Sequence, residues 1–235
     1  MPQITVACLD MAGTTVADDG SVMAAFDAAA AEFGLVEGAP GYDEAIAFVQ
    51  DTMGQSKIEV FRQLLARLGQ AGEGQAQRAN RIFERSYAES VHQGLVSPLP
   101  GAIETITALR AAGIKVCLAT GFAPVTRDAL LDALGWRPLI DLALSPADAG
   151  RGRPWPDMPL TALIRLGGGS VTELAVVGDT PSDVECGLRA GAGLVAGVTT
   201  GAGSRESLAA AGAPHILASI GDLVQLIGVG SAAVQ

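Results

Sequence analysis

Two acidic segments of this chain have the residue types and spacing of a catalytic or metal-binding site. Asp10 directly follows the apolar run Ile4–Leu9 and precedes a turn of hydrogen-bond donors, Gly13–Thr15. Asp179 and Asp183 are four residues apart, so a helix beginning between them places both carboxylates around one cavity. Carboxylates placed in this way can act as a nucleophile or hold a hard cation such as Mg²⁺. Each acid could instead be a helix N-cap, which is a common role for Asp in such turns.

Two further segments offer groups that bind an anion. Thr120 and Gly121 follow the apolar run Ile114–Ala119 and provide a hydroxyl and a free backbone N–H. Arg151 and Arg153 lie in a loop that is rich in glycine and proline, and their guanidinium groups suit phosphate oxygens. Taken one at a time these signals are weak, but their combination and order along the chain make a strong signal.

Short apolar runs alternate with helical patterns along most of the chain, and the candidate site residues follow these runs. Each run is continuous, which is typical of strands buried on both faces of a parallel sheet. The predicted strands are Ile4–Leu9, Ile114–Ala119, Leu139–Leu144, Leu174–Val177 and Gly193–Val198, and the predicted helices are Ala102–Ala112, Val125–Leu134, Pro159–Leu166, Ser182–Ala190 and Ser204–Ala211. This order predicts an α/β fold with a doubly wound parallel sheet, whose ligands bind beyond the carboxyl ends of the strands.

A long helical segment interrupts the alternation after the first predicted strand. It has no convincing strand, and its helical patterns are Met23–Phe33, Glu44–Val49, Lys57–Leu68 and Gln75–Val91. We expect an α-helical cap domain over residues 18–96, inserted into an α/β core domain formed by residues 1–17 and 97–235. A cap that hangs from the loop after the first strand would lie over the sheet edge that carries Asp10.

Composition excludes several classes of protein. The chain has 235 residues, of which 49% are hydrophobic, and a net charge of −10, which argues against the basic face that nucleic-acid binding needs. No run approaches the roughly 20 apolar residues of a membrane-spanning helix, and the first residues lack the basic region of a secretory signal. The three scattered cysteines, Cys8, Cys117 and Cys186, fit neither a disulfide framework nor a metal site. A cytoplasmic enzyme with no membrane or nucleic-acid partner is expected.

The order of the candidate segments resembles the haloacid dehalogenase (HAD) superfamily, which transfers phosphoryl groups through an aspartyl phosphate with Mg²⁺. The resemblance covers the predicted core domain and implies a Rossmann-like sheet. It implies that Asp10 is the nucleophile, that Thr120 and the Gly121 N–H bind phosphoryl oxygens, and that Arg153 neutralises their charge. The implied ligands of Mg²⁺ are Asp10, the backbone carbonyl of Ala12, Asp179 and, through water, Asp183.

Ala12 departs from the phosphatases of this superfamily, most of which have an aspartate there that protonates the leaving group. The form Asp-x-Ala-Gly-Thr-Thr resembles the phosphonoacetaldehyde hydrolases, or phosphonatases, which cleave a carbon–phosphorus bond. In that family a cap lysine forms a Schiff base with the substrate aldehyde, and the leaving group is an enamine carbon. Such a leaving group explains why no acid is present at this position. The family's lysine lies in a Met-Gly-x-x-Lys segment, which matches Met53, Gly54 and Lys57. Lys57 could instead be a solvated residue in the first turn of a cap helix.

Three positions differ from the phosphonatase pattern. Val60 stands where that family has a histidine, Phe122 stands where it has a tyrosine, and Ser21 stands near the start of the cap where a cysteine is expected. The two histidines, His92 and His215, lie outside the motifs. We therefore expect the core chemistry to be retained while the polar groups around the organic part of the substrate differ.

These observations predict a Mg²⁺-dependent hydrolase that cleaves the phosphorus–carbon bond of a small carbonyl phosphonate, phosphonoacetaldehyde or a relative. The expected catalytic residues are Asp10, Lys57, Thr120 and Arg153, and the expected substrate-binding residues are Ala12, Met53, Gly54, Gly121 and Phe122. A phosphatase for a small-molecule phosphate monoester is the alternative, and a binding protein without turnover is a third reading. Two copies could pair through the cap, as the resemblance implies, although packing within one chain explains the apolar cap helices equally well.

Overall fold

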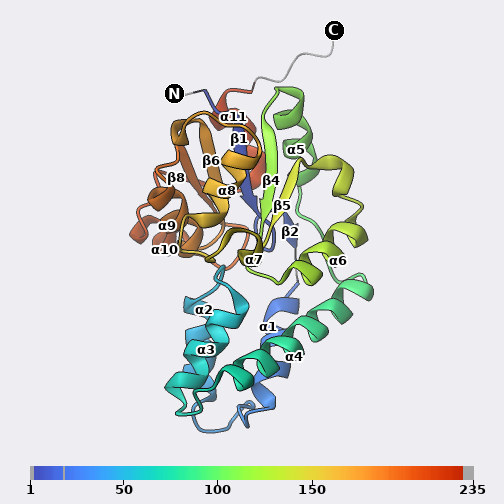
Figure 1. Cartoon of the computed structure of the whole chain (residues 1–235), viewed down its shortest axis with the longest axis vertical. Helices are drawn as coiled ribbons and strands as arrows, with labels where there is room; N and C mark the ends of the chain where they lie inside the picture. Colours follow the sequence, from blue (N-terminus) through green and yellow to red (C-terminus); the bar gives the residue numbers. More distant parts are fainter. Residues whose placement is uncertain (1–2, 18, 230–235) are drawn as a thin grey trace.

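The structure is a computed structural model that describes residues 3–17 and 19–229. A six-stranded sheet lies at its centre in the order β5-β4-β1-β6-β7-β8, and all neighbouring strands are parallel (Figure 1). The strands are β1 (Val6–Asp10), β4 (Lys115–Ala119), β5 (Leu142–Leu144), β6 (Leu174–Gly178), β7 (Leu194–Val198) and β8 (His215–Leu217). The predicted α/β fold with a parallel sheet is confirmed. Strand β8 was not predicted from the sequence, because its three half-buried residues follow a proline and do not form an apolar run.

Helices cover both faces of the sheet, which explains why its central strands are apolar along their whole length. In β1, Ala7 and Leu9 belong to the same buried cluster as residues of helix α5, while Val6 and Cys8 belong to a second cluster with residues of α8. The helices of this part are α5 (Ala102–Ala111), α6 (Pro124–Leu134), α7 (Pro146–Ala149), α8 (Asp157–Arg165), α9 (Pro181–Ala190), α10 (Arg205–Ala210) and α11 (Leu223–Ile227), with short 3-10 turns at Arg137–Leu139, Val171–Glu173 and Ile220–Asp222. All three cysteines are free and buried.

Four helices lie between two short strands that follow β1 and precede α5. The helices are α1 (Ser21–Ala31), α2 (Tyr42–Asp51), α3 (Lys57–Arg67) and α4 (Glu73–His92), and Figure 1 shows them as a separate group below the sheet. The strands β2 (Val16–Ala17) and β3 (Ser97–Pro98) pair antiparallel, so the insert leaves and re-enters the α/β part side by side. We propose that these four helices are the cap domain. The predicted first cap residue, Asp18, lies outside the described residues.

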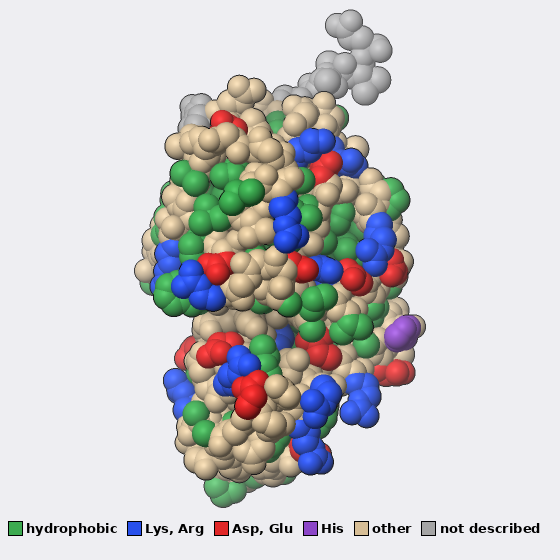
Figure 2. Space-filling model, viewed as in Figure 1, with side chains coloured by type: hydrophobic (Ala, Val, Ile, Leu, Met, Phe, Trp, Pro, Cys, Tyr) green, Lys and Arg blue, Asp and Glu red, His purple; other side chains and the backbone are tan. Residues whose placement is uncertain are grey.

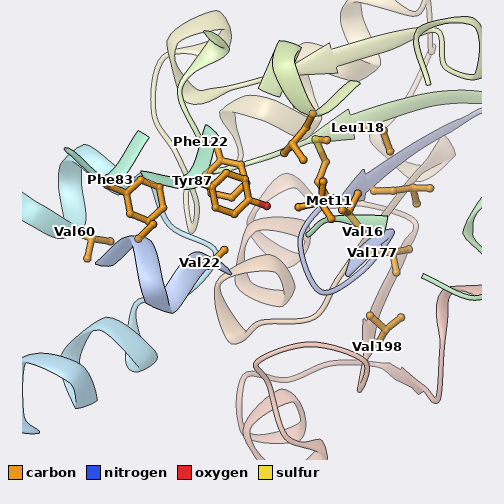
Figure 3. Close-up of a cluster of buried hydrophobic side chains, with 14 of the residues drawn as sticks. Met11, Val16, Val22, Val60, Phe83, Tyr87, Leu118, Phe122, Val177 and Val198 are labelled. Carbon is orange, nitrogen blue, oxygen red and sulfur yellow. The ribbon is translucent and has the colours of Figure 1, made fainter. Parts of the chain in front are cut away.

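The cap has its own aromatic core, which is continuous with the α/β part. The rings of Phe26, Phe61 and Phe83 come from α1, α3 and α4, with centroids 4.7 to 6.0 Å apart. Phe83 also lies 6.0 Å from the ring of Phe122, which follows β4, and Tyr87 lies 4.5 Å from that ring (Figure 3). Removing a buried ring of this kind costs about 3–5 kcal/mol in other proteins. This shared cluster therefore holds the cap against the sheet edge.

The surface shown in Figure 2 has acidic and basic side chains interspersed, with no large area of one sign. The expectation that nucleic acid is not a partner rests on the net charge of −10 and stays a prediction. Within the described part of the chain, no helix has the length and apolar character needed to cross a membrane. Pairing of two copies through the cap stays a prediction.

Candidate active site

The polar residues at the strand ends line a cavity of about 400 Å³ between the sheet edge and the cap. Asp10 ends β1, Thr120 follows β4, Asp179 follows β6 and Thr200 follows β7. The parallel arrangement brings these side chains to one edge, as the sequence predicts. The predicted site residues that line the cavity are Asp10, Ala12, Met53, Gly54, Lys57, Thr120, Gly121, Phe122, Arg153 and Asp179, whereas Asp183 is not part of the lining.

Arg153 is the electrostatic centre of the cavity floor. Its guanidinium group lies 2.8 Å from a carboxylate oxygen of Asp10 and 2.6 Å from one of Asp183. It also donates hydrogen bonds to the backbone carbonyls of Ala119 (3.1 Å) and Gly54 (3.2 Å). Arg153, Asp10, Asp183 and Ala119 are buried, and a buried guanidinium group needs such partners. Arg153 therefore ties the nucleophile candidate, the sheet and the cap loop together.

Asp10 is a buried carboxylate with too little positive charge around it. Burial raises its pKa well above the usual value; the charge of Arg153 opposes this, and the nearby Asp183 and Asp179 raise the pKa further. The Thr15 hydroxyl donates to the backbone carbonyl of Asp10 at 2.8 Å, which fixes the turn after β1. Asp10 and Asp183 thus share the guanidinium group of Arg153, with the charge of Asp179 close by, and a second cation at this place would stabilise the ionised forms.

Asp179 is held by a loop that sequence analysis missed. One of its carboxylate oxygens accepts a hydrogen bond from the Thr14 hydroxyl (3.2 Å), and the other accepts one from the Ala202 backbone N–H (2.8 Å). Burial, followed by the charge of Asp183, raises its pKa to about 7. A Cβ atom added at Gly13 or Gly201 would lie 2.5 or 2.0 Å from this carboxylate, so both glycines are needed for the close packing. The loop after β7 has the sequence Thr-Thr-Gly-Ala-Gly. Its position at the carboxyl end of a predicted strand could have identified it as part of the site.

Asp183 is not the N-cap of α9, which is Thr180, but the third helical residue of the same capping box. As part of a capping box it accepts hydrogen bonds from the backbone N–H and the hydroxyl of Thr180, which begins α9. Its other oxygen pairs with Arg153. Asp183 therefore positions Arg153 and α9, and its predicted contact with Mg²⁺ through water stays a prediction.

The donor set fits a Mg²⁺ ion, although it is smaller than expected. Across residues 3–17 and 19–229, no group of three or more His, Cys, Asp and Glu side chains is arranged to hold a metal ion. The charge of Asp179 nevertheless raises the pKa of Asp10, burial raises the pKa of both carboxyl groups, and Ala12 lies in the same cavity lining. Mg²⁺ characteristically uses one or two carboxylates and completes its shell with water and phosphate oxygens. These three groups would hold it.

Substitution of Asp179 should mainly affect Mg²⁺ binding, whereas substitution of Asp183 should mainly affect the stability of the fold. We expect Asp179→Ala to weaken Mg²⁺ binding by roughly 100-fold or more, and Asp183→Ala by about 10-fold, as for a group behind the ligands. Asp183→Ala should lower thermal stability more, because it removes a helix cap and a partner of buried Arg153. Titration calorimetry with Mg²⁺ and unfolding in EDTA measure the two effects. Equal Mg²⁺ affinities would contradict this assignment.

The loop between α2 and α3 places Lys57 over the sheet edge. The Lys57 backbone N–H donates to the Gly121 carbonyl at 3.2 Å, and the Gly54 carbonyl accepts from Arg153. A Cβ atom at Gly54 would lie 2.4 Å from the Thr180 hydroxyl oxygen, and one at Gly121 would lie 2.3 Å from the Gln55 carbonyl oxygen. Glycine at both positions lets the cap loop approach the core backbone. The Met-Gly-x-x-Lys segment therefore has two roles: its glycine allows the cap loop to contact the core backbone, and its lysine side chain enters the cavity.

The Lys57 side chain is buried, with only 5% of its surface exposed, and aromatic rings surround its amine. Its Nζ lies 5.4, 5.9 and 5.5 Å from the ring centroids of Phe26, Phe83 and Phe122. Burial lowers the pKa of Lys57 to about 8, with the charge of Asp10 opposing and that of Arg153 assisting. The alternative of a solvated lysine is wrong, because Lys57 is enclosed by side chains from α1, α4 and the loop after β4.

Three further residues, Val60, Ser21 and Glu84, are not part of the cavity lining. Val60 and Ser21, which replace polar groups of the phosphonatase pattern, are both buried. Glu84 of α4 accepts hydrogen bonds from the Thr126 hydroxyl and, at 3.2 Å, from the Ala123 backbone N–H at the start of α6. Burial raises the pKa of Glu84, and its charge also acts on Lys57. No motif in the sequence marks this link between cap and core. His92 and His215 do not line the cavity.

Comparison with known proteins agrees with this geometry. Residues 4–191 match the haloacid dehalogenase-like hydrolase family. A phosphonoacetaldehyde hydrolase of Hahella chejuensis is 35% identical over 133 residues, which make up 55% of this chain and 44% of that protein. The chain thus matches less than half the length of that relative.

Two further relatives match almost the whole chain. A Dickeya dadantii protein named "Probable phosphatase IndB" is 29% identical over 218 residues, 92% of this chain and 90% of that protein. The crystal structure of a phosphonoacetaldehyde hydrolase-like protein from Oleispira antarctica has a TM-score of 0.81 and 26% identity, and covers 97% of this chain and 92% of that chain. The matched proteins therefore include both a probable phosphatase and phosphonoacetaldehyde hydrolase-like proteins.

Proposed function

Because the chain belongs to the haloacid dehalogenase-like hydrolases, we propose that it cleaves the phosphorus–carbon bond of a small carbonyl phosphonate, phosphonoacetaldehyde or a relative. The observation that carries this proposal is the environment of Lys57. A buried amine among three aromatic rings, with a pKa lowered to about 8, can be neutral and nucleophilic near physiological pH. Ala12, in the position of the usual acid, supports the same conclusion because a carbon leaving group needs no proton from that position.

Each catalytic side chain has a defined task in this proposal. The Lys57 amine attacks the substrate carbonyl carbon, water leaves, and an iminium ion remains bound to Lys57. The Asp10 carboxylate then attacks phosphorus, and the electrons of the breaking carbon–phosphorus bond move into the iminium to give an enamine. Thr120, the Gly121 N–H and Arg153 stabilise the phosphoryl oxygens in transit. A bound Mg²⁺ would offset the negative charge shared by the phosphoryl group and Asp10.

Two hydrolyses complete the cycle and balance the reaction. Water cleaves the aspartyl phosphate on Asp10 and releases inorganic phosphate. The enamine takes a proton on carbon, and a second water releases the aldehyde or ketone and restores the Lys57 amine. One water is consumed overall, because imine formation releases the other. A difficult displacement is thus divided into easier steps.

A phosphatase for a small phosphate monoester is the second candidate. The relative named as a phosphatase covers 92% of this chain, and Phe122 and Val60 lack the polar groups of the phosphonatase pattern. In that function Lys57 acts as an ammonium ion that attracts the substrate. Water or a cap residue would have to supply the proton that Ala12 cannot supply.

The pH dependence distinguishes the two functions, because they need opposite protonation states of Lys57. With a pKa of about 8, the neutral amine falls tenfold per pH unit below that value. For carbon–phosphorus cleavage, kcat/KM of the free enzyme should rise with pH and level off above about 8, with about 100-fold less activity at pH 6. A phosphatase that uses the ammonium form should lose activity above pH 8. A profile for a carbonyl phosphonate that falls through pH 8 would contradict the Schiff base.

A further inference from the structure

The carboxylate of Glu84 joins the helical cap to the start of helix α6 in the α/β part. Glu84 lies on α4 and accepts a hydrogen bond from the backbone N–H of Ala123 at 3.2 Å and another from the hydroxyl of Thr126. Both donors are at the start of α6, and α4 packs against α6 along one side of the molecule (Figure 1). Glu84 does not line the cavity, so any effect that it has on a reaction there must act through other residues.

These two hydrogen bonds supply a helix cap that the sequence of α6 lacks. In a capping box, the side chain of the third helical residue accepts a hydrogen bond from the N–H of the N-cap residue. In α6 the third helical residue is Thr126, and the N-cap is Ala123, which has no side-chain oxygen. The acceptor is instead Glu84, which is 39 residues away in the chain. The helix dipole also favours a carboxylate at this end of a helix, which strengthens the contact.

The same contact fixes the backbone beside two of the three rings around the Lys57 amine. Phe83 directly precedes Glu84, and Phe122 directly precedes Ala123. The centroids of these two rings are 6.0 Å apart, and the Nζ of Lys57 lies 5.9 Å from the first and 5.5 Å from the second. Figure 3 shows both rings within one cluster of buried side chains. The hydrogen bond from Ala123 to Glu84 therefore holds the two rings together.

Glu84 acts on Lys57 in two opposite ways. Its negative charge raises the pKa of Lys57, as do the charges of Asp10 and Asp179, whereas the charge of Arg153 lowers it. Burial is the largest cause of the lowered pKa, and the two rings contribute to that burial. A contact that keeps the rings in place therefore lowers the pKa of Lys57, while the charge of the same carboxylate raises it.

We propose that Glu84 is a positioning residue for Lys57, and that its contact with the start of α6 acts as a clamp that holds the rings of Phe83 and Phe122 against the amine. Burial exceeds every charge in its effect on Lys57, and the charge of Glu84 acts less strongly than those of Asp10 and Arg153. The clamp therefore outweighs the charge. Its importance for catalysis rests on the proposed function, in which Lys57 must be neutral, but the position of the rings does not.

The sign of the change in the Lys57 pKa tests this proposal without any substrate. The rate at which acetic anhydride acetylates Lys57, measured from about pH 6 to 11 by peptide mass spectrometry, gives the pKa of its amine. Lys115, on the surface, is the internal reference for the reagent. In Glu84→Ala we expect the Lys57 pKa to rise from about 8 by about one unit or more, toward the value of about 10.4 for a solvated lysine. A pKa that falls or stays the same would overturn the proposal.

The same change has a consequence for turnover. A rise of about one unit lowers the neutral fraction of Lys57 at pH 7 by about tenfold. In the proposed function, kcat/KM for an aldehyde phosphonate at pH 7 should fall by about the same factor and recover at higher pH. A loss of activity in Glu84→Ala that is equal at every pH would indicate a general structural defect and would contradict the proposed role.

A second variant weakens the clamp without removing the charge. Thr126→Val loses one of the two hydrogen bonds and keeps Glu84, so the pKa of Lys57 should rise by a smaller amount. If Glu84 acted through its charge alone, Thr126→Val would leave that pKa unchanged, and this result would overturn the proposal even if Glu84→Ala did not fold. Glu89→Ala, at an exposed position of the same helix, is the matched control and should leave the pKa as in the wild type. Thermal unfolding verifies that each variant is folded at the labelling temperature.

Failure of the proposed function gives a different pattern of results. A Lys57 pKa that rises in Glu84→Ala, in an enzyme that forms no imine with phosphonoacetaldehyde, supports the clamp and contradicts the Schiff base. An imine in the wild type, together with an unchanged pKa in Glu84→Ala, supports the Schiff base and contradicts the clamp. The two outcomes are therefore separable.

Discussion

Replacing Asp10 by asparagine is expected to abolish turnover while the fold stays intact. Asparagine keeps the shape of the side chain but removes the nucleophilic charge, so kcat should fall on the order of 10⁴ to 10⁶-fold, as for loss of a covalent nucleophile. Steady-state release of phosphate measures the loss. Beryllofluoride, which mimics a phosphorylated carboxylate, should bind the wild type at Asp10 and should not bind the variant.

The stability of this variant provides its control. Burial raises the pKa of Asp10, so the charge is unfavourable in the folded protein, and Arg153 keeps Asp183 as a partner at 2.6 Å. Thermal unfolding of Asp10→Asn should therefore occur at the wild-type temperature or above it. Asp43→Asn, on the exposed surface of α2, should change neither property. Near-native activity of Asp10→Asn would rule out the aspartyl-phosphate route.

Replacing Lys57 by arginine is expected to eliminate carbon–phosphorus cleavage and to leave metal and anion binding in place. Arginine keeps a positive charge but cannot form an imine, so kcat/KM for an aldehyde phosphonate should fall by at least about 10³-fold. Mg²⁺ and vanadate should still bind, because their predicted partners are on the α/β part. If the protein is instead a phosphatase, Lys57→Arg should retain much of its activity on a phosphate ester.

Two companion variants make this experiment decisive. Lys57→Met removes both charge and nucleophile and suits the aromatic surroundings, so it should be stable and equally inactive. Lys115, the other lysine of the chain, begins β4 and pairs with Asp141 on the surface. Lys115→Arg is the matched control and should have full activity. Carbon–phosphorus cleavage that survives in both Lys57 variants would contradict the proposed role of the lysine.

The placement of site residues that directly follow a strand could be predicted from the sequence. Asp10, Thr120 and Asp179 each follow an apolar run, and parallel strands bring their carboxyl ends to one edge. The inserted helices were recognisable because α4 buries Ala76, Ala79, Phe83, Tyr87 and Val91, which lie at helical spacing along one face. In both cases a local pattern determines the placement.

Features that depend on distant segments could not be predicted in the same way. The rings around Lys57 come from residues 26, 83 and 122, and nothing in the local pattern of any one of them indicates the others. The pairing of Arg153 with both Asp10 and Asp183 depends on tertiary packing. The contact from Ala202 to Asp179 uses a backbone N–H, which has no signature in the sequence.

Borohydride reduction in the presence of phosphonoacetaldehyde tests the central claim most directly. A Schiff base on Lys57 would be reduced to a stable secondary amine, which intact mass spectrometry detects and peptide mapping locates. We predict one adduct per chain on the peptide that contains Lys57, present in wild type and Lys115→Arg and absent in Lys57→Arg. An enzyme that is active on phosphonoacetaldehyde but shows no adduct, or an adduct that persists in Lys57→Arg, would contradict the account.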